Sequence, residues 1–361
     1  MIEIDGSYGE GGGQILRTSL TLSILTGKPL RIYRIRAGRK EPGLKPQHLM
    51  SAHAVTQISG GKLIGAELGS TELLFYPGTI RPGNYTLDVA SVKASAGATT
   101  LIFQTIFLPL GFATNPSHVI LKGGTHVPWS PPADYIKEVF LPTVASMGIE
   151  TKLKNPMKGF YPIGGGVLET TIAPIQTPLK PLQIQNRGHL KQVRILSTTA
   201  NLPLSIAKRQ LNRAVDLFTE QGFQPRGETQ AVESPGKGTF CFILAEFEWV
   251  RAGFSSLGAI GKRAEQVADE AVEGFLGFHQ GQGALERHLA DQVVLCMALA
   301  EGESRVTVAE VTDHLKTNIW VIEQFLPVRF VLKQDPAGGI HNLHVTGAAW
   351  KIPTSLRDFY A

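Results

Sequence analysis

The sequence predicts an α/β protein of the α+β type, built from three repeats of two helices on a small sheet and one smaller inserted α/β unit. The prediction comes from segments that share a plan. In each of them small residues precede a helical run, a glycine follows the run, and the same order of strands and helices comes next. The glycines are Gly27, Gly111 and Gly302, and glycine often ends helices because it adopts the left-handed conformation without strain.

Each repeat is expected to run helix, strand, loop, helix, strand, strand. The elements are predicted at 14–25, 30–35, 47–58, 62–64 and 72–75, then at 101–110, 119–121, 133–146, 150–153 and 167–172, and finally at 285–299, 305–308, 318–325, 328–332 and 342–345. Because an amphipathic helix must bury its apolar face, each helix pair is expected to cover one face of its own sheet. A chance match of patterns is the competing interpretation.

The spacing of the glycines predicts an insertion. Gly27 and Gly111 are 84 residues apart, whereas Gly111 and Gly302 are 191 apart, so the second interval is longer by 191 − 84 = 107 residues. We place the insertion at 183–279, which leaves 1–182 and 280–361 as the large repeat domain. Its expected elements are a strand at 192–196, a helix at 204–221, strands near 240–247 and a helix at 262–275.

Composition points to a soluble cytoplasmic protein. Hydrophobic residues make up 43% of the chain and charged residues 18%, which excludes a disordered chain. The acidic start lacks the basic flank of a signal peptide. The long uncharged stretch 94–121 is interrupted by polar residues and prolines, so a buried helix and a turn are expected there and not a membrane span. Cys241 and Cys296 lie in apolar runs and are expected to be core thiols in a reducing compartment.

Polar residues gather in the three predicted strand-to-helix loops, 36–47, 123–132 and 309–317. Equivalent loops of equivalent repeats are expected to converge, and functional sites are commonly built on such loops. They would form a basic, histidine-containing cleft, although a solvated loop is the simpler interpretation of the arginines. The residues concerned are Arg36, Arg39, Gln47, His126, Asp313, His314 and Asn318.

His314 is the candidate for chemistry. We expect it just before a helix, where amide groups and the helix dipole favour anions. An imidazole there can act as a base or as a nucleophile that forms a phosphoramidate. A capping or surface role is the more common one for a single histidine. The other histidines show no metal signature, since His341 and His344 are three apart in a predicted strand and point to opposite faces.

The glycine-rich run at 9–14 suggests a phosphate loop of a non-standard kind. Gln14 occupies the last glycine position of the dinucleotide fingerprint, and no βαβ pattern with a ribose-binding acid supports that motif. Glu10 lies inside the run. Because a carboxylate repels phosphate, it is better suited to holding Mg²⁺ together with phosphate.

These residues resemble a known family, the RNA 3′-terminal phosphate cyclases. The resemblance covers nearly the whole chain up to about Val345. It lies in the motifs DGSYGEGGGQILR at 5–17, RAGR at 36–39, PGL at 42–44, QH at 47–48, KGFYPIGGGV at 158–167, LADQ at 289–292 and HLKTN at 314–318.

The resemblance implies a fold and a reaction. The fold has three repeats of two helices on a four-stranded sheet, with an inserted domain related to the C-terminal domain of translation initiation factor three. The reaction is the ATP-dependent conversion of an RNA 3′-phosphate to a 2′,3′-cyclic phosphate. A histidine, by position His314, first takes AMP from ATP; the AMP passes to the RNA 3′-phosphate, and the 2′-hydroxyl then displaces it. RNA with a 3′-phosphate end is the expected partner, and a homodimer is left open.

The resemblance and the chemistry together suggest roles for the other site residues. Glu10 is expected to hold Mg²⁺ or Mn²⁺, and Phe254 of the insertion is a candidate for stacking on adenine. The residues expected to bind phosphates are Arg17, Arg36, Arg39 and Gln47. Those that match ATP-contacting positions of the family are Gln104, His288, Leu289, Ala290, Asp291 and Gln292.

Two positions depart from the family pattern. Lys158 stands where His or Arg is common, and His288 where some relatives have Tyr.

Two other functions compete with the cyclase. A catalytically silent ribosome-assembly protein of the same fold would lack the nucleophilic histidine, which this chain has. An enolpyruvyl transferase shares a similar repeat fold, but its motifs are missing here.

Overall fold

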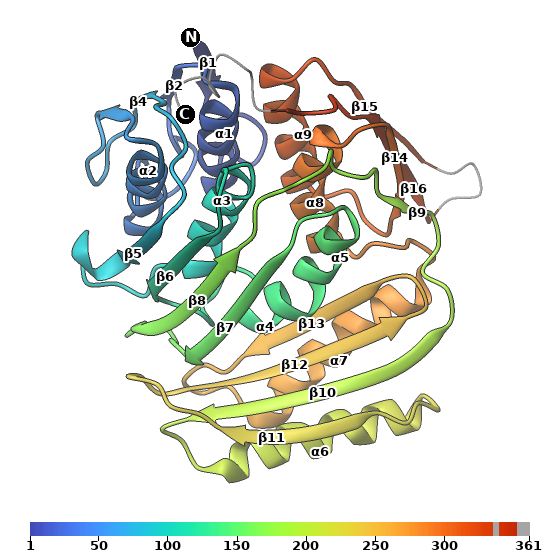
Figure 1. Cartoon of the computed structure of the whole chain (residues 1–361). Helices are drawn as coiled ribbons and strands as arrows, with labels where there is room; N and C mark the ends of the chain where they lie inside the picture. Colours follow the sequence, from blue (N-terminus) through green and yellow to red (C-terminus); the bar gives the residue numbers. More distant parts are fainter. Residues whose placement is uncertain (335–338, 352–361) are drawn as a thin grey trace.

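Three sheets of this protein share one strand order, and a fourth sheet belongs to an insertion (Figure 1). The structure, a computed structural model, describes residues 1–334 and 339–351. Within those residues each sheet has four strands. The α+β class with three helix-on-sheet repeats is therefore confirmed.

The first two repeats have the same element order. The first repeat consists of β1 (Ile2–Asp5), α1 (Gly13–Thr26), β2 (Leu30–Tyr33), α2 (Pro46–Ser59), β3 (Lys62–Ile64) and β4 (Leu73–Tyr76). The second consists of β5 (Asn84–Asp88), the short 3₁₀ helix Val89–Ser91, α3 (Thr99–Gly111), β6 (Ser117–Gly123), α4 (Ala133–Tyr135), a π-helical segment (Ile136–Phe140), α5 (Leu141–Ser146), β7 (Thr151–Met157) and β8 (Gly166–Ile172). Their sheets have the orders β1-β2-β4-β3 and β5-β6-β8-β7.

The third repeat is divided by the insertion. It consists of β9 (Gln183–Ile184), α8 (Arg287–Leu299), β14 (Glu303–Val308), α9 (Asp313–Phe325), β15 (Phe330–Gln334) and β16 (His341–Thr346). Because β9 pairs with β14 in the parallel sense, Gln183 and Ile184 belong to the third sheet and not to the insertion, where we had placed them. The insertion therefore interrupts the repeat between its first strand and its first helix.

The insertion forms a sheet of its own from Leu190 onward. Its elements are β10 (Leu190–Ala200), α6 (Leu204–Glu220), β11 (Arg226–Ala231), β12 (Gly238–Phe247), β13 (Arg251–Leu257) and α7 (Ala264–Gln280). The order β11-β10-β12-β13 differs from the order in the three repeats. Strands β11 and β13 were not predicted; β11 is largely exposed and polar, so it lacks a hydrophobic signal.

The helices of the three repeats pack against one another in the middle of the large domain, with the sheets outside them (Figure 1). Helix α3 illustrates this packing, since nearly all of its residues are buried. It lies in the uncharged stretch for which a buried helix was expected.

Cys241 and Cys296 are both buried free thiols. Among the described residues, none of the helices combines the length and apolarity needed to cross a bilayer.

Three details of the repeat prediction were wrong. The first strand of each repeat was missed, because β1, β5 and β9 all lie before the small-residue runs from which the repeats were recognised. Of the three glycines used to predict the repeats, Gly27 alone ends its helix in the left-handed conformation, with φ of 66°. Gly111 is the last residue of α3, and Gly302 lies in the turn after α8. Helix α9 begins at Asp313, five residues earlier than expected.

Candidate active site

The topology brings the helix N-termini of the three repeats to one place. In each repeat the first two strands run parallel, and a helix follows each of them in the chain. Both helices of a repeat therefore begin at the same end of its sheet. Free backbone amides and the positive end of the helix dipole make such N-termini favourable for anions.

Specific contacts join these N-termini across the repeats. The loop before α1 meets α9 where Glu10 Oε2 lies 2.7 Å from His314 Nδ1. Helix α2 meets α3 where Gln47 Oε1 accepts the N–H of Ala98 at 3.1 Å. Helix α4 meets α8 where the Tyr135 hydroxyl donates to Glu286. Helix α8 meets α9 where Asn318 Nδ2 donates to the carbonyl of Asp291 at 2.7 Å. The three repeats therefore bring these N-termini to a common centre, which we call the anion-binding centre because such N-termini favour anions.

His314 lies in the first turn of α9 and not in the loop before the helix. Thr312 caps this helix by accepting the N–H of Leu315 at 3.1 Å. The imidazole is 46% exposed, and its contact with Glu10 raises the pKa of His314. Because Nδ1 faces Glu10, Nε2 is the ring nitrogen that remains for a ligand.

The glycine-rich loop holds Glu10 against α9. Arg39 donates to the Glu10 carboxylate and to its carbonyl oxygen. The N–H of Glu10 donates to Thr317 Oγ1 at 3.3 Å, and the ring of Tyr8 stacks on Trp320 with centroids 3.9 Å apart. The close contact with His314 lowers the pKa of Glu10, so the carboxylate is charged at neutral pH.

Arg17, which is buried, and Asp291, which is half-buried, lie near His314 and Glu10. Burial lowers the pKa of Arg17 to about 10, against the opposing effect of Asp291 and Glu10. Burial, together with the nearby charge of Glu286, raises the pKa of Asp291 to about 7 against the opposing effect of His314. An acid that gains or loses its proton near neutral pH lies next to the nucleophile candidate, which is typical of functional sites.

Two other predicted phosphate-binding residues are partly engaged in contacts within the protein. Arg36, with φ of 54°, donates to the carbonyl oxygens of Glu41 and Gly43. The side-chain oxygen of Gln47 is occupied by Ala98. Burial lowers the pKa of Arg36, with the charge of Arg39 adding to the effect.

The predicted ATP-contacting residues of α8 separate into two groups. Gln292 accepts from Gln104 Nε2 at 2.6 Å, and both line a cavity of about 40 Å³ together with Arg17 and Asn318. His288 is exposed at the start of the helix.

The side chains of Leu289 and Ala290, in contrast, are wholly buried in the core. Their N–H groups are bonded to Glu286, through its side chain and its carbonyl oxygen respectively. These two residues support the helix and offer a ligand neither a side chain nor a free donor.

Phe254 does not join the site, contrary to our expectation. Its ring packs against Phe275 and Phe278 of α7, with centroids 6.0 and 5.6 Å away. The neighbouring Gly253 faces the other way, toward Tyr135 of the large domain. Side chains alternate along a strand, so Phe254 points away from the large domain and into the insertion's own core.

His126 was expected in the cleft, but the structure buries it at the start of α4. Its Nε2 lies 2.7 Å from Asp134 Oδ2, which Lys158 Nζ also contacts at 2.7 Å. Thr125 Oγ1 lies 2.8 Å from Nδ1. Burial lowers the pKa of His126 to about 4, and the charge of Lys158 contributes. This cluster fixes the start of α4 and does not line the anion-binding centre.

Several residues that build the centre were not predicted. Glu286 caps α8 and receives the Tyr135 hydroxyl, and Thr317 holds the glycine-rich loop. His48 is buried beneath that loop, and its Nε2 lies 2.3 Å from where a side chain on Gly13 would begin. The partners of these residues lie far away in the sequence, so local spacing does not reveal them. Glu286 is the exception, because its position three residues before Leu289 is a recognisable helix-cap signal.

The fold and this centre together define a three-repeat α+β protein in which a histidine, a carboxylate and arginines gather at helix N-termini, a candidate anion site. The chain matches the model of the RNA 3′-terminal phosphate cyclase family over residues 8–332. It therefore belongs to that family.

Curated relatives that bear the same name come from bacteria and archaea. The protein of Methylococcus capsulatus is 42% identical over 95% of this chain and 96% of its own length. That of Gloeothece citriformis is 46% identical over 90% and 93%. That of Archaeoglobus fulgidus is 42% identical over 90% and 96%.

Proposed function

We propose that this protein converts the 3′-terminal phosphate of RNA to a 2′,3′-cyclic phosphodiester at the expense of ATP, with His314 as the residue that carries AMP. One observation carries the proposal. His314 is oriented by Glu10, and the pair lies among helix N-termini with Arg39 bound to the same carboxylate and Arg17 beneath. The names of the relatives support the reaction class.

In the first step Nε2 of His314 attacks the α-phosphorus of ATP. A nitrogen–phosphorus bond forms, the bond to the β-phosphate oxygen breaks, and pyrophosphate leaves. Glu10 keeps the Nδ1 proton in place and compensates the positive charge that develops on the ring. Phosphoryl transfer depends mainly on positioning and charge neutralisation, which the arginines and helix N-termini supply.

In the second step an oxygen of the RNA 3′-phosphate attacks the adenylate on His314, and the histidine leaves with its lone pair. In the third step the 2′-oxygen attacks the 3′-phosphorus, loses its proton, and AMP leaves. The adenylate supplies the leaving group that a phosphate monoester lacks. The 2′-hydroxyl is already close to the phosphorus, so this step benefits from proximity.

The residues present fit a divalent cation. Magnesium is commonly held by one or two carboxylates together with substrate phosphates and water, and Glu10 lies beside the anion-binding centre. Within 1–334 and 339–351, no three His, Cys, Asp or Glu side chains gather into a metal cage. We infer that Glu10 would hold Mg²⁺ or Mn²⁺ with the phosphates of ATP, and that the ion would supply charge neutralisation when bound.

Incubation with α-labelled ATP and Mg²⁺ tests the proposal. The expected result is an acid-labile AMP adduct that disappears when RNA with a 3′-phosphate is added, with cyclic-ended RNA as product. His314→Ala should abolish the adduct, whereas His118→Ala, at an exposed position, should keep it. An undiminished adduct on His314→Ala would reject the assignment. RNA binding without any ATP turnover would favour the catalytically silent alternative.

A further inference from the structure

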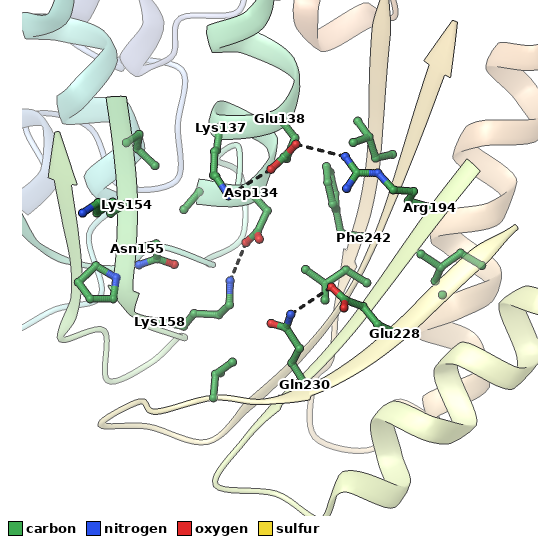
Figure 2. Close-up of a pocket in the computed structure, with 18 of the residues that line it drawn as sticks. Asp134, Lys137, Glu138, Lys154, Asn155, Lys158, Arg194, Glu228, Gln230 and Phe242 are labelled. Carbon is green, nitrogen blue, oxygen red and sulfur yellow. Dashed lines mark hydrogen bonds and ion pairs between the residues drawn. The ribbon is translucent and has the colours of Figure 1, made fainter. Parts of the chain in front are cut away.

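A large groove lies between the second repeat and the insertion (Figure 2). Its volume is about 750 Å³. One wall is formed by α4, the π-helical segment and β7, and the other by β10, β11 and β12. Nothing in the proposed function uses this groove.

The pleat of β11 aims a polar row into the groove. Arg226, Glu228 and Gln230 line it, and their spacing of two puts them on one face of the strand. The other face packs on α6, where a Cβ on Gly227 would lie 2.3 Å from Leu211. Beneath the polar row, Phe242 and Leu244 of β12 form an apolar floor. The groove therefore combines polar, open rims with an apolar base.

Cations outnumber acids around the groove. The cations are Lys137, Lys154, Lys158, Arg194 and Arg226, and the acids are Asp134, Glu138 and Glu228. Asp134 is paired with Lys158, and Glu138 with Lys137 and Arg194.

Two of the cations remain without a charged partner. Lys154 and Arg226 are exposed and, within the described part of the chain, make no ion pair. They lie on opposite walls, one on β7 and the other on β11. The Lys154 side chain points outward at the rim of the groove (Figure 2), and Arg226 lines the other wall, so a negatively charged chain that enters between the walls would pass close to both.

One end of the groove lies beside the anion-binding centre. Asp134 is the second residue of α4, and the next residue, Tyr135, donates to Glu286 at the start of α8. Strand β7 runs parallel to β6, since both are antiparallel to β8. The end of β7 that leads to Lys158 is therefore the end where the helices begin, so the groove leads outward from that centre.

We propose that this groove binds the single-stranded part of the RNA that precedes its 3′-phosphate end, with Lys154 and Arg226 contacting backbone phosphates. The proposal rests on the proposed function, which places the 3′-phosphate at His314. Proteins that bind single strands without regard to sequence combine a positively charged groove with apolar surfaces against which bases pack. A groove of that kind starts here next to the reacting end.

The test compares a long and a short RNA. A 12-nucleotide RNA with a 3′-phosphate and a 5′ fluorophore reaches the groove, whereas a dinucleotide 3′-phosphate does not. We expect Lys154→Ala/Arg226→Ala to weaken binding of the 12-mer about tenfold, measured by fluorescence anisotropy. The salt dependence should fall by about 1.4 in the slope of log K against log salt, because each phosphate contact with a single strand contributes about 0.7.

Two further variants sharpen the comparison. Glu228→Gln removes a groove carboxylate and should tighten binding of the 12-mer. Lys62→Ala/Lys208→Ala removes two exposed lysines outside the groove and should leave binding unchanged. Labelling by ATP and cyclisation of the dinucleotide should be unaffected in every variant.

The outcomes separate the groove from the proposed function. A Lys154→Ala/Arg226→Ala protein that binds the 12-mer with unchanged affinity and salt slope overturns the groove proposal. So does a variant that keeps RNA binding but loses binding of an acidic peptide, which would identify a protein ligand instead. Absence of the AMP adduct in the unchanged chain would reject the proposed function, while the anisotropy comparison would still decide whether RNA lies in the groove.

Discussion

Nδ1 of His314 lies 2.7 Å from Oε2 of Glu10, although the two residues belong to opposite ends of the chain. The contact fixes the direction of the imidazole, raises the pKa of His314 and lowers that of Glu10. It joins the third repeat to the first and turns two ordinary side chains into an oriented pair. The carboxylate is shared with Arg39, so the pair is anchored from the glycine-rich loop as well as from α9.

Glu10→Gln should slow formation of the AMP adduct about 100-fold, since the amide cannot compensate positive charge on the ring. The acidic limb of the pH–rate profile should also move to lower pH. Glu10 raises the pKa of His314, so without it the imidazole loses its proton at lower pH. The measurement is the rate of labelling by ATP across a pH series.

Glu41→Gln is the control for that experiment. Glu41 is exposed in the neighbouring loop and pairs with Lys45, so it should keep the normal rate and profile. If Glu10→Gln showed an unchanged rate and an unmoved acidic limb, the role of the pair in catalysis would be refuted.

Asn318→Ala should lower the free energy of unfolding by roughly 2 kcal/mol, because it leaves buried polar groups without partners. Asn318 accepts from Thr18 Oγ1 at 2.7 Å and donates to the carbonyl of Asp291 at 2.7 Å, so it joins α1, α8 and α9. Urea unfolding followed by circular dichroism measures the change. Gln324→Ala, on an exposed position of the same helix, should change stability by less than about 0.5 kcal/mol. Equal losses in the two variants would contradict the prediction.

Part of this site could be predicted from the sequence, and there are physical reasons why the other residues could not. The glycine-rich loop, Arg39 and His314 are recognisable because their residue types and local spacing carry the information. The contact between Tyr135 and Glu286 joins residues 151 apart, and local spacing cannot specify such a pair. Likewise, Phe254 in a strand could face either side, and only the packing of α7 on the sheet decides which.

The same distinction holds for the fold. Helices α1 and α3 have long apolar patterns, so they were found with nearly correct bounds. Strand β9 has two residues and gains its identity only by pairing with β14 across the whole insertion. The start of α9 was placed too late because its first turn is polar; the cap by Thr312, and not hydrophobic periodicity, defines it.

Stability should fall as the pH decreases below about 6.5, because two buried histidines resist protonation in the folded chain. Burial lowers the pKa of His126 from 6.5 to about 4 and that of His48 to about 3. Above pH 6.5 both are neutral in the folded and unfolded states. Below pH 6.5 the histidines become protonated in the unfolded chain but stay neutral in the folded chain. Each histidine therefore lowers the free energy of unfolding by about 1.4 kcal/mol per pH unit until its folded pKa is reached.

His126→Gln and His48→Gln should each remove part of this pH dependence. Urea unfolding at pH 7.5 and 5.5 measures the difference for each variant. His118→Gln, at an exposed position, should keep the dependence of the unchanged chain. A pH dependence that is the same in all of these proteins would show that the buried histidines are not its source.

Gly9→Ala should disturb the loop that presents Glu10, and Thr317→Ala should relieve much of the effect. Gly9 has φ of 55°, and a Cβ there would lie 2.3 Å from Thr317 Oγ1. The left-handed conformation alone costs a non-glycine residue roughly 1 kcal/mol, and Gly69→Ala measures that cost separately, since Gly69 has φ of 81° and nothing within 4 Å of its Cβ position. Gly9→Ala should therefore lose more stability than Gly69→Ala, and it should label with AMP at least tenfold more slowly than Gly69→Ala.

The double variant Gly9→Ala/Thr317→Ala tests the cause. Its nearest remaining atom at position 317 is Cβ, 3.5 Å from the new Cβ, which is an ordinary contact. Labelling should therefore return to the rate of Thr317→Ala alone. If the double variant labelled as slowly as Gly9→Ala, the close approach of the glycine-rich loop to α9 would not be the reason that glycine is needed.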